Sequence, residues 1–518
     1  MFVTNYIKMN KLIKNYVSLS QLKLNIITNY ISKLWTNLLS FLLVPIYLYY
    51  LGIEAYGLIG AFYTITSFIN LLDLGLGTTL NREVALRNST IESKTTIPNL
   101  LKTAEIIYWC MSVALIILLV LLTPIISTQW LKADKLNSET IHWAVVILGF
   151  TIAIRWAITP YKSTLIGLEK QVSLNIFECL IITLRDLGGI AILLWVSRTI
   201  VFFLFWQGLI AVIEVFLFVI LAWQNLPIKN IQARFEIKII QQIWQFAMTV
   251  NWTTLVSLLL TQLDKILLSK FVSLEKFGYY AIAYTLASSI ITIFQPFMVA
   301  ISPHLTILIA QGKIDKLKYA FHKSSLFITI LITPIATVFI FFAPTVLEIW
   351  THSPEVITQA SEPLRLLSFG ILMGSMIQVQ YLLQLAIGKP QIYALFGTFS
   401  VLFATPMFFL LLPRFELIGA AIIWAILNTV YYLLFSRITH FYILPNEYLR
   451  WLFQDTLIPM IICFTVSFIN FQLQSYFPEI QIISIGIVTV INYGLLFLWY
   501  KYQIKSMLIS SQNRKLKI

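Results

Sequence analysis

The sequence has few charged residues and few cysteines. Only 11% of its 518 residues are charged, whereas soluble domains usually carry about a quarter. Each of the three cysteines lies inside an apolar run, and none belongs to a CxxC pair or neighbours a histidine cluster (Cys110, Cys179, Cys463). We therefore expect neither a disulfide framework nor a metal site.

Motifs of soluble enzymes are also missing. The chain contains no GxxxxGK[ST] loop for ATP, no GxGxxG after a strand and no HExxH. The five histidines are scattered and form no constellation. We expect no catalytic residue and no cofactor, and transport driven directly by ATP would require a separate subunit.

Apolar residues make up 59% of the chain, and its mean hydropathy is +0.84. Six runs long enough to cross a bilayer lie near residues 24–50, 56–80, 104–127, 140–167, 174–197 and 199–225. Six more lie near 242–270, 277–302, 324–348, 362–388, 391–412 and 416–440, and two final runs lie near 455–475 and 479–500. This pattern predicts an all-α polytopic membrane protein with about fourteen transmembrane helices.

The basic residues are unevenly distributed between the two predicted sides of the membrane. The net charge is +14, and 23 Lys and Arg residues fall in both termini and alternate loops, against 6 in the other loops. The positive-inside rule therefore predicts that both termini are cytoplasmic. Because the charge follows this topology, we expect no nucleic-acid partner. The first span has no A-x-A-like cleavage site and is expected to remain uncleaved.

The two halves of the chain match each other when shifted by 221 residues. The segment 51–65 then lies on 272–286, which aligns Gly57 with Gly278. Because each half holds an even number of spans, the two copies form a parallel repeat. The predicted parts are an N-terminal tail (1–23), an N-lobe (24–225), a connector (226–241), a C-lobe (242–440), two additional helices (455–500) and a basic tail (501–518).

Polar side chains inside apolar spans are costly when they face lipid, so we expect them to face a cavity or a neighbouring helix. Lys33 and Asn37 share one face of the first helix. Intramembrane cations in one cavity would attract an anion, and Arg can bind phosphate oxygens bidentately. The predicted substrate-binding residues are Lys33, Asn37, Asn70, Arg155, Lys265 and Arg365.

Intramembrane carboxylates are candidates for binding a coupling proton or Na⁺. Five occur in the predicted spans (Asp73, Glu178, Asp186, Glu214, Asp264). Their positions do not rank them, and we take Asp73, Glu178 and Asp264 as the ion-coupling candidates.

Each of these polar groups also has a purely structural interpretation. Hydroxyls and amides can form interhelical hydrogen bonds, and a buried cation can pair with a carboxylate, as Arg185 can with Glu178. Lys162 lies near enough to a cytoplasmic end to snorkel. We favour the structural interpretation for Arg185 and a functional one for Lys33 and Arg155.

Residues 37–85 resemble the opening of polysaccharide-transporter proteins. The matching features are Pro45, LGIEAYG (51–57), LLDLGLG (71–77) and NREVA (81–85). These transporters include the O-antigen flippases of the multidrug/oligosaccharidyl-lipid/polysaccharide exporter superfamily. The remainder of the chain resembles the family only in helix count and loop placement.

The resemblance implies a two-lobed flippase that moves undecaprenyl-diphosphate-linked oligosaccharides across the inner membrane by alternating access, for surface polysaccharide synthesis. A lipopolysaccharide O-antigen, a capsule or an exopolysaccharide is the implied product. An H⁺ or Na⁺ gradient is the expected driver, and the expected partners are membrane lipids, a polysaccharide polymerase and a chain-length regulator. The alternatives are an ion-coupled multidrug exporter of the same superfamily and a membrane glycosyltransferase or polymerase.

Overall fold

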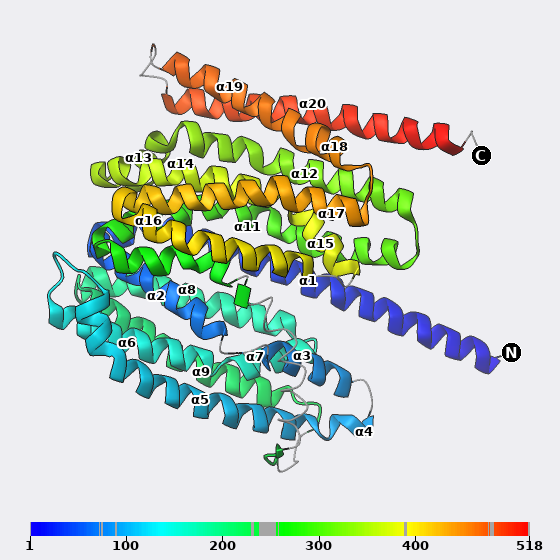
Figure 1. Cartoon of the computed structure of the whole chain (residues 1–518). Coiled ribbons are helices and arrows are strands. Elements are labelled where there is room, and N and C mark those ends of the chain that lie inside the picture. The colour runs from blue at the N-terminus through cyan, green and yellow to red at the C-terminus, as the bar shows by residue number, and fades with distance from the viewer. Residues whose placement is uncertain are drawn as a thin grey trace. The chain divides into compact units, whose positions relative to one another are not determined.

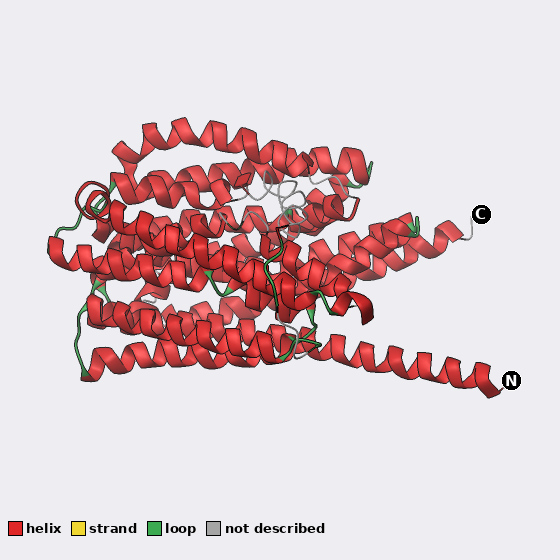
Figure 2. Ribbon diagram, turned by 90° about the horizontal axis from the view of Figure 1, so that it is seen from below, coloured by secondary structure: helices red, strands yellow, loops and turns green. Residues whose placement is uncertain are grey.

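The computed structural model describes residues 2–71, 73, 76–88, 91–228, 233–237, 255–256, 258–387, 391–474, 476 and 481–515. Nearly all of these residues are helical, and none of them is in a strand (Figure 2). The predicted all-α class is confirmed.

The chain divides into two compact units. Unit 1 comprises Met1–Ala55 and Phe62–Asn251, and unit 2 comprises Tyr56–Ala61 and Trp252–Ile518. Within unit 1, α1 packs along α8, and α6 packs against both α5 and α9 (Figure 1). The elements of its range, with α2 contributing to both units, are α1 (Phe2–Leu51), α2 (Ile53–Leu71), α3 (Leu76–Arg87), α4 (Ile91–Lys94), α5 (Ile97–Ile125), η1 (Ile126–Trp130), α6 (Ser138–Trp156), α7 (Thr159–Gly167), α8 (Gln171–Trp195) and α9 (Ile200–Gln224).

Unit 2 is built around α14, which packs against α11, α12 and α16, while α19 and α20 pack together against α12 (Figure 1). Residues 258–271 are helical and precede the labelled elements. These elements are α11 (Leu274–Ala310), α12 (Ile314–Phe341), α13 (Ala343–Thr351), α14 (Pro354–Met376), α15 (Gln378–Ile387), α16 (Gln391–Val430), η2 (Tyr431–Phe435), α17 (Ser436–Ile443), α18 (Tyr448–Arg450), η3 (Trp451–Leu457), α19 (Ile458–Gln474) and α20 (Gln481–Lys515).

Ten helical stretches among the described residues are long and apolar enough to cross a membrane. The longest of them, Tyr393–Ile443, has non-helical backbone at Glu416, which divides it into two segments. Two more predicted spans correspond to α2 and to α8, which contains three charged residues. A third is the range 242–270, part of which lies outside the described residues. The chain is a multi-span membrane protein, and these segments together account for the predicted total of about fourteen.

The LGIEAYG segment has a structural role at the turn between α1 and α2. Gly52 ends α1 at a φ of +80°, a left-handed conformation that favours glycine. In unit 1, the Glu54 carboxylate accepts hydrogen bonds from the backbone N–H groups of residues 134–136 at 2.5–2.9 Å. In unit 2, Gly57 lies against the backbone of α11, where an added Cβ would be 2.2 Å from the Leu274 carbonyl oxygen. The segment therefore positions backbone elements.

The fourth span of each half is broken at an equivalent position. In unit 1, the turn residues Ala157 and Ile158 separate α6 from α7, and Pro160 follows in the first turn of α7. In unit 2, Ile377 separates α14 from α15. The 221-residue shift aligns Trp156 with Ile377, so the breaks coincide within two residues. Irregular backbone at membrane depth is tolerated where protein or a cavity surrounds it, and paired broken helices point to binding sites in repeat transporters.

Candidate functional site

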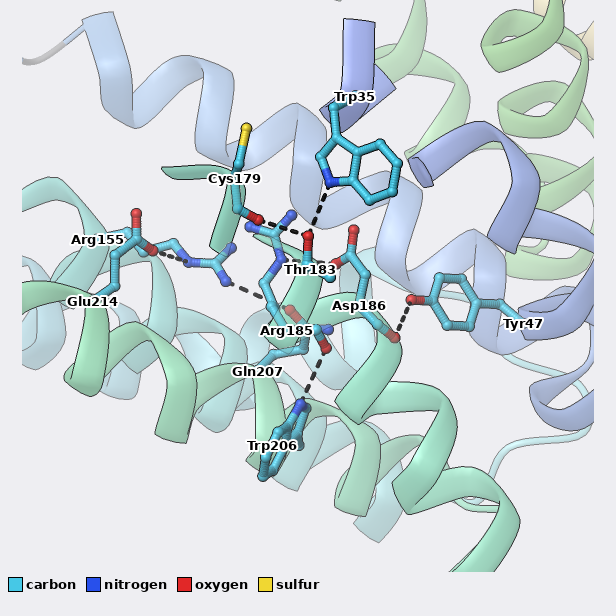
Figure 3. A network of polar contacts seen from close by, with 10 residues as sticks. All are labelled: Trp35, Tyr47, Arg155, Cys179, Thr183, Arg185, Asp186, Trp206, Gln207 and Glu214. Carbon is cyan, nitrogen blue, oxygen red and sulfur yellow. Dashed lines mark hydrogen bonds and ion pairs between the residues drawn. The ribbon is translucent and has the colours of Figure 1, made fainter. Parts of the chain in front are cut away.

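Four charged side chains meet beside the break in unit 1. The Lys162 ammonium lies 2.9 Å from Glu178 and 3.1 Å from Glu214, and it also stands 4.6 Å from the centroid of the Phe218 ring. Arg155, at the end of α6, approaches the other Glu214 oxygen at 3.9 Å (Figure 3). Lys162 is thus held by two acids within the protein rather than snorkelling to the interface as predicted.

Arg155 is bound much less tightly than Lys162. Its contact with Glu214 is long, and its other contact, from Nη2 to the Gln207 side-chain oxygen, is 3.5 Å (Figure 3). The buried Nε atom of Arg155 has no hydrogen-bond partner among the described residues. Since a buried polar group without a partner is costly, this guanidinium has donors available for an anion.

Arg185 lies next in this network but pairs differently from the prediction. Its Nε atom lies 2.8 Å from Asp186, rather than from Glu178 (Figure 3). Glu178 is instead occupied by Lys162. The Trp206 indole donates to the Arg185 carbonyl at 3.0 Å, so both side chain and backbone of this residue are fixed. The predicted structural role of Arg185 agrees with this geometry, although its predicted partner was wrong.

In unit 2, Asp264 and Lys265 form a buried pair on the helical residues 258–271. The Lys265 ammonium lies 3.3 Å from Asp264 and 3.7 Å from the centroid of the Tyr284 ring. The Tyr280 hydroxyl donates to the second Asp264 oxygen at 2.7 Å. Lys265, predicted to bind substrate, is therefore buried behind an aromatic ring with its charge compensated.

The remaining predicted residues lie apart from these two clusters. Lys33 and Asn37 are exposed on α1, and Lys33 has no acid partner within the described structure. Arg365 lies 2.7 Å from Glu362 on its own helix. Asp73 accepts a hydrogen bond from the Tyr108 hydroxyl and one from the Gly77 backbone N–H at 3.1 Å, which fixes the start of α3. The side chain of Asn70 lies outside the described residues.

The structure thus assembles only part of the predicted site. Arg155 and Glu178 belong to one network, joined through Lys162 and Glu214, and Asp264 and Lys265 form one pair. The sequence analysis did not select Glu214 as a site residue, although it contacts both Arg155 and Lys162. Its only sequence signal is that it is an acid inside an apolar span.

Comparisons with known proteins agree with this architecture. The family model described as "Polysaccharide biosynthesis protein" matches residues 22–309, and the MatE model matches residues 252–410. Among solved structures, the lipid II flippase MurJ in an inward closed conformation superposes with a TM-score of 0.68 at 15% identity, covering 93% of this chain and 99% of that one. An inward-facing multidrug resistance MATE family transporter of the MOP superfamily superposes with a TM-score of 0.63 at 15% identity, covering 80% and 94%. A comparison with curated proteins finds no match.

The fold is that of transporters and flippases of the multidrug/oligosaccharidyl-lipid/polysaccharide (MOP) exporter superfamily. The first family model covers more than half of the 518 residues. This chain belongs to the polysaccharide biosynthesis protein family.

Proposed function

We propose that this protein is a flippase that moves undecaprenyl-diphosphate-linked oligosaccharide units across the bacterial inner membrane for surface polysaccharide synthesis. The observation that carries this proposal is the family match over residues 22–309, in a chain with the fold of MOP transporters. A transporter rather than an enzyme is also supported by the solved structures that it resembles, which are transporters and a flippase.

The network in unit 1 supports a site for the diphosphate. The Nε atom of Arg155 makes no hydrogen bond within the described structure, and the two polar contacts of the guanidinium, to Glu214 and Gln207, are long, so phosphate oxygens could replace weak interactions with short charge-assisted ones. Lys33, on α1 of the same unit, carries a charge that no described acid compensates. We therefore assign binding of the anionic head group in unit 1 to Arg155, with Lys33 as a separate candidate on α1.

The experiment uses protein reconstituted in vesicles with a fluorescent undecaprenyl-diphosphate-linked sugar in one leaflet. The wild type should increase the rate at which the label appears in the other leaflet. Arg155→Gln and Lys33→Gln should each reduce this rate at least tenfold, while the exposed Arg414→Gln variant should match the wild type. Unchanged translocation in both Arg155→Gln and Lys33→Gln would refute the cationic site.

A multidrug exporter is the second candidate, and the MatE match over residues 252–410 favours it. Such a transporter would need an available carboxylate for cationic drugs, but Glu178, Glu214 and Asp264 each lie within 3.3 Å of a lysine. Drug accumulation in cells with and without the protein decides between the two. Equal drug accumulation in cells with and without the protein, together with loss of surface glycan in the deletion strain, supports the flippase.

We further propose that an H⁺ or Na⁺ gradient drives alternating access, with Asp73, Glu178 and Asp264 as the coupling candidates. A polysaccharide polymerase and a chain-length regulator would then act on the exported units. Dissipating the proton or the sodium gradient separately in the vesicle assay identifies the coupling ion, because only the relevant gradient should change the rate.

A further inference from the structure

Unit 2 contains a cavity of about 590 Å³ at the break between α14 and α15. Its wall includes the aromatic rings of Tyr284, Tyr381 and Trp424, with two further tyrosines, and the side-chain amides of Gln295, Gln378 and Asn428. This volume lies within the range of about 300–1,000 Å³ that is usual for small-ligand pockets. The cavity is therefore large enough for more than a solvent molecule.

The lining of this cavity is neutral. Among the described residues that form its wall, none is charged. The ammonium of Lys265 lies 3.7 Å from the ring centroid of the lining residue Tyr284 and 5.8 Å from that of Trp424, and it is paired with Asp264. The described lining therefore offers no positive charge to attract a phosphate.

The combination of flat aromatic faces and side-chain amides in this cavity suits a sugar ligand. A pyranose ring presents apolar C–H faces, which pack on aromatic rings, and a rim of hydroxyls, which need both donors and acceptors. Gln295 supplies an amide that makes no hydrogen bond within the described structure and lies on the exposed part of α11. A neutral sugar satisfies both kinds of surface at once.

The helix break adds backbone polar groups at this position. The N–H of Ile377 reaches back only to the Ser375 carbonyl, and the Gln378 side chain donates to the Gly374 carbonyl at 3.3 Å. Gly374, Ser375, Ile377 and Gln378 all line the cavity. Broken helices at corresponding positions of two halves commonly form substrate sites in transporters.

We propose that this cavity of unit 2 binds the neutral sugar portion of the lipid-linked substrate. The inference rests on the proposed flippase function. It assigns sugar recognition to Gln295, Tyr381 and their neighbours, and it leaves anion binding to Arg155.

The test measures the affinity of the purified full-length protein in nanodiscs for two probes. One probe is undecaprenyl diphosphate carrying a single N-acetylhexosamine, and the other is undecaprenyl diphosphate alone. The wild type should bind the glycosylated probe more tightly. Gln295→Leu should lower this preference about fivefold, which corresponds to one net hydrogen bond. Tyr381→Ala should lower it about tenfold, and neither variant should change the affinity for the bare carrier.

Matched controls are the exposed residues Gln311 and Tyr442, whose Gln311→Leu and Tyr442→Ala variants should keep the wild-type preference. Tyr381→Phe keeps the stacking surface and should retain most of the preference, which guards against a folding defect in Tyr381→Ala.

The outcomes separate this inference from the proposed function. Wild-type protein that binds neither probe contradicts the flippase function itself. Wild-type protein that binds both probes equally, or Gln295→Leu and Tyr381→Ala variants that both keep the wild-type preference, would overturn the sugar site while leaving the flippase function standing.

Discussion

Arg155 and Lys162 differ in how firmly their acid partners hold them. Lys162 has contacts of 2.9 and 3.1 Å to two carboxylates, whereas the ion-pair contact of Arg155 is 3.9 Å, to one of the same carboxylates. The energy of a charge pair rises as distance falls and as water is excluded. Glu214 therefore acts as an internal competitor for any anion that approaches Arg155.

Removing the charge of Glu214 should strengthen anion binding. Glu214→Gln leaves Arg155 without its carboxylate, so we expect the affinity for undecaprenyl diphosphate to rise about fivefold to tenfold, as for the loss of one moderate ion pair. Equilibrium binding in nanodiscs measures this change. Glu139→Gln, at an exposed position, serves as the control. An affinity that stays at the wild-type value or falls would show that Glu214 does not compete.

Charge compensation is the common property of these half-buried and buried cations. Arg155, Lys162 and Arg185 all lie within 4 Å of acids in unit 1, as Lys265 does in unit 2. Ionised groups removed from water need such partners, because desolvation costs several kcal/mol for each ion. A cation inside a span is thus a weaker indication of anion binding than the sequence alone suggests.

At the scale of secondary-structure elements, close backbone packing explains Gly57. This glycine of α2 packs on α11 within unit 2, where a Cβ atom would lie 2.2 Å from the Leu274 carbonyl oxygen and 3.0 Å from the Gly278 nitrogen. Backbone atoms cannot move aside as a flexible side chain can. The LGIEAYG segment, which carries the family resemblance, is therefore tied to the fold.

Gly57→Ala should destabilise the protein by about 2–4 kcal/mol, because overpacking against backbone forces the helices apart. We expect a lower thermal unfolding midpoint in detergent and a lower yield of monodisperse protein. Gly486→Ala on α20 is the matched control, since nothing lies within 4 Å of its added Cβ. Unfolding midpoints for Gly57→Ala and Gly486→Ala that coincide would argue against this packing.

A second group of charged residues fastens the C-terminal elements to α12. The buried His322 side chain lies 2.6 Å from Asp455 on η3 and 3.1 Å from Glu447, and Lys318 lies 2.7 Å from Glu447. Hydrogen bonds from His322 and Lys318 hold the pKa of Glu447 at about 2, although partial burial opposes this shift. These contacts connect α12 to the segment that leads into α19.

Glu447→Gln should lower the unfolding free energy at pH 7 by about 1–3 kcal/mol, as expected for the loss of hydrogen bonds to a charged group. A lowered pKa stabilises the fold above the ordinary value of about 4.5, and this stabilisation is lost as the pH falls toward 2. The difference in thermal unfolding midpoint between the wild type and Glu447→Gln should therefore be largest at pH 7 and 5 and smaller at pH 3. Glu348→Gln, at an exposed position, is the control. Equal unfolding midpoints of the wild type and Glu447→Gln at pH 7 would contradict the stabilising role of Glu447.

At the scale of the whole molecule, the distribution of basic residues orients the chain. The 23 to 6 asymmetry between the two sets of loops and termini predicts cytoplasmic termini. Among the described residues, ten helical stretches are long and apolar enough to span a membrane.

A reporter fused at the C-terminus tests this orientation. A fluorescent protein fused after Ile518 should be bright, and alkaline phosphatase at the same position should be inactive, because it folds only in the periplasm. Fusions in the predicted periplasmic loop near Arg198 should give the opposite result. Active phosphatase at the C-terminus would reverse the predicted topology.

Composition and periodicity alone determined the class of this protein. Apolar runs of bilayer length leave no other environment for the helices, and the 221-residue shift that lays segment 51–65 on 272–286 can be found in the chain alone. The N-terminal segments 51–57 and 71–77 were sufficient to suggest the family. These features are local or periodic, so they can be read without knowing which helices meet.

Only the tertiary structure decided how the polar residues are partnered. Lys162 reaches Glu214 across 52 residues, while Arg185 pairs with its neighbour Asp186 and Lys162 with Glu178. The neutral cavity likewise draws its wall from α11, α14, α15 and α16, which are far apart in the chain. An interaction of this kind depends on the packing of helix faces, and no single segment contains that information.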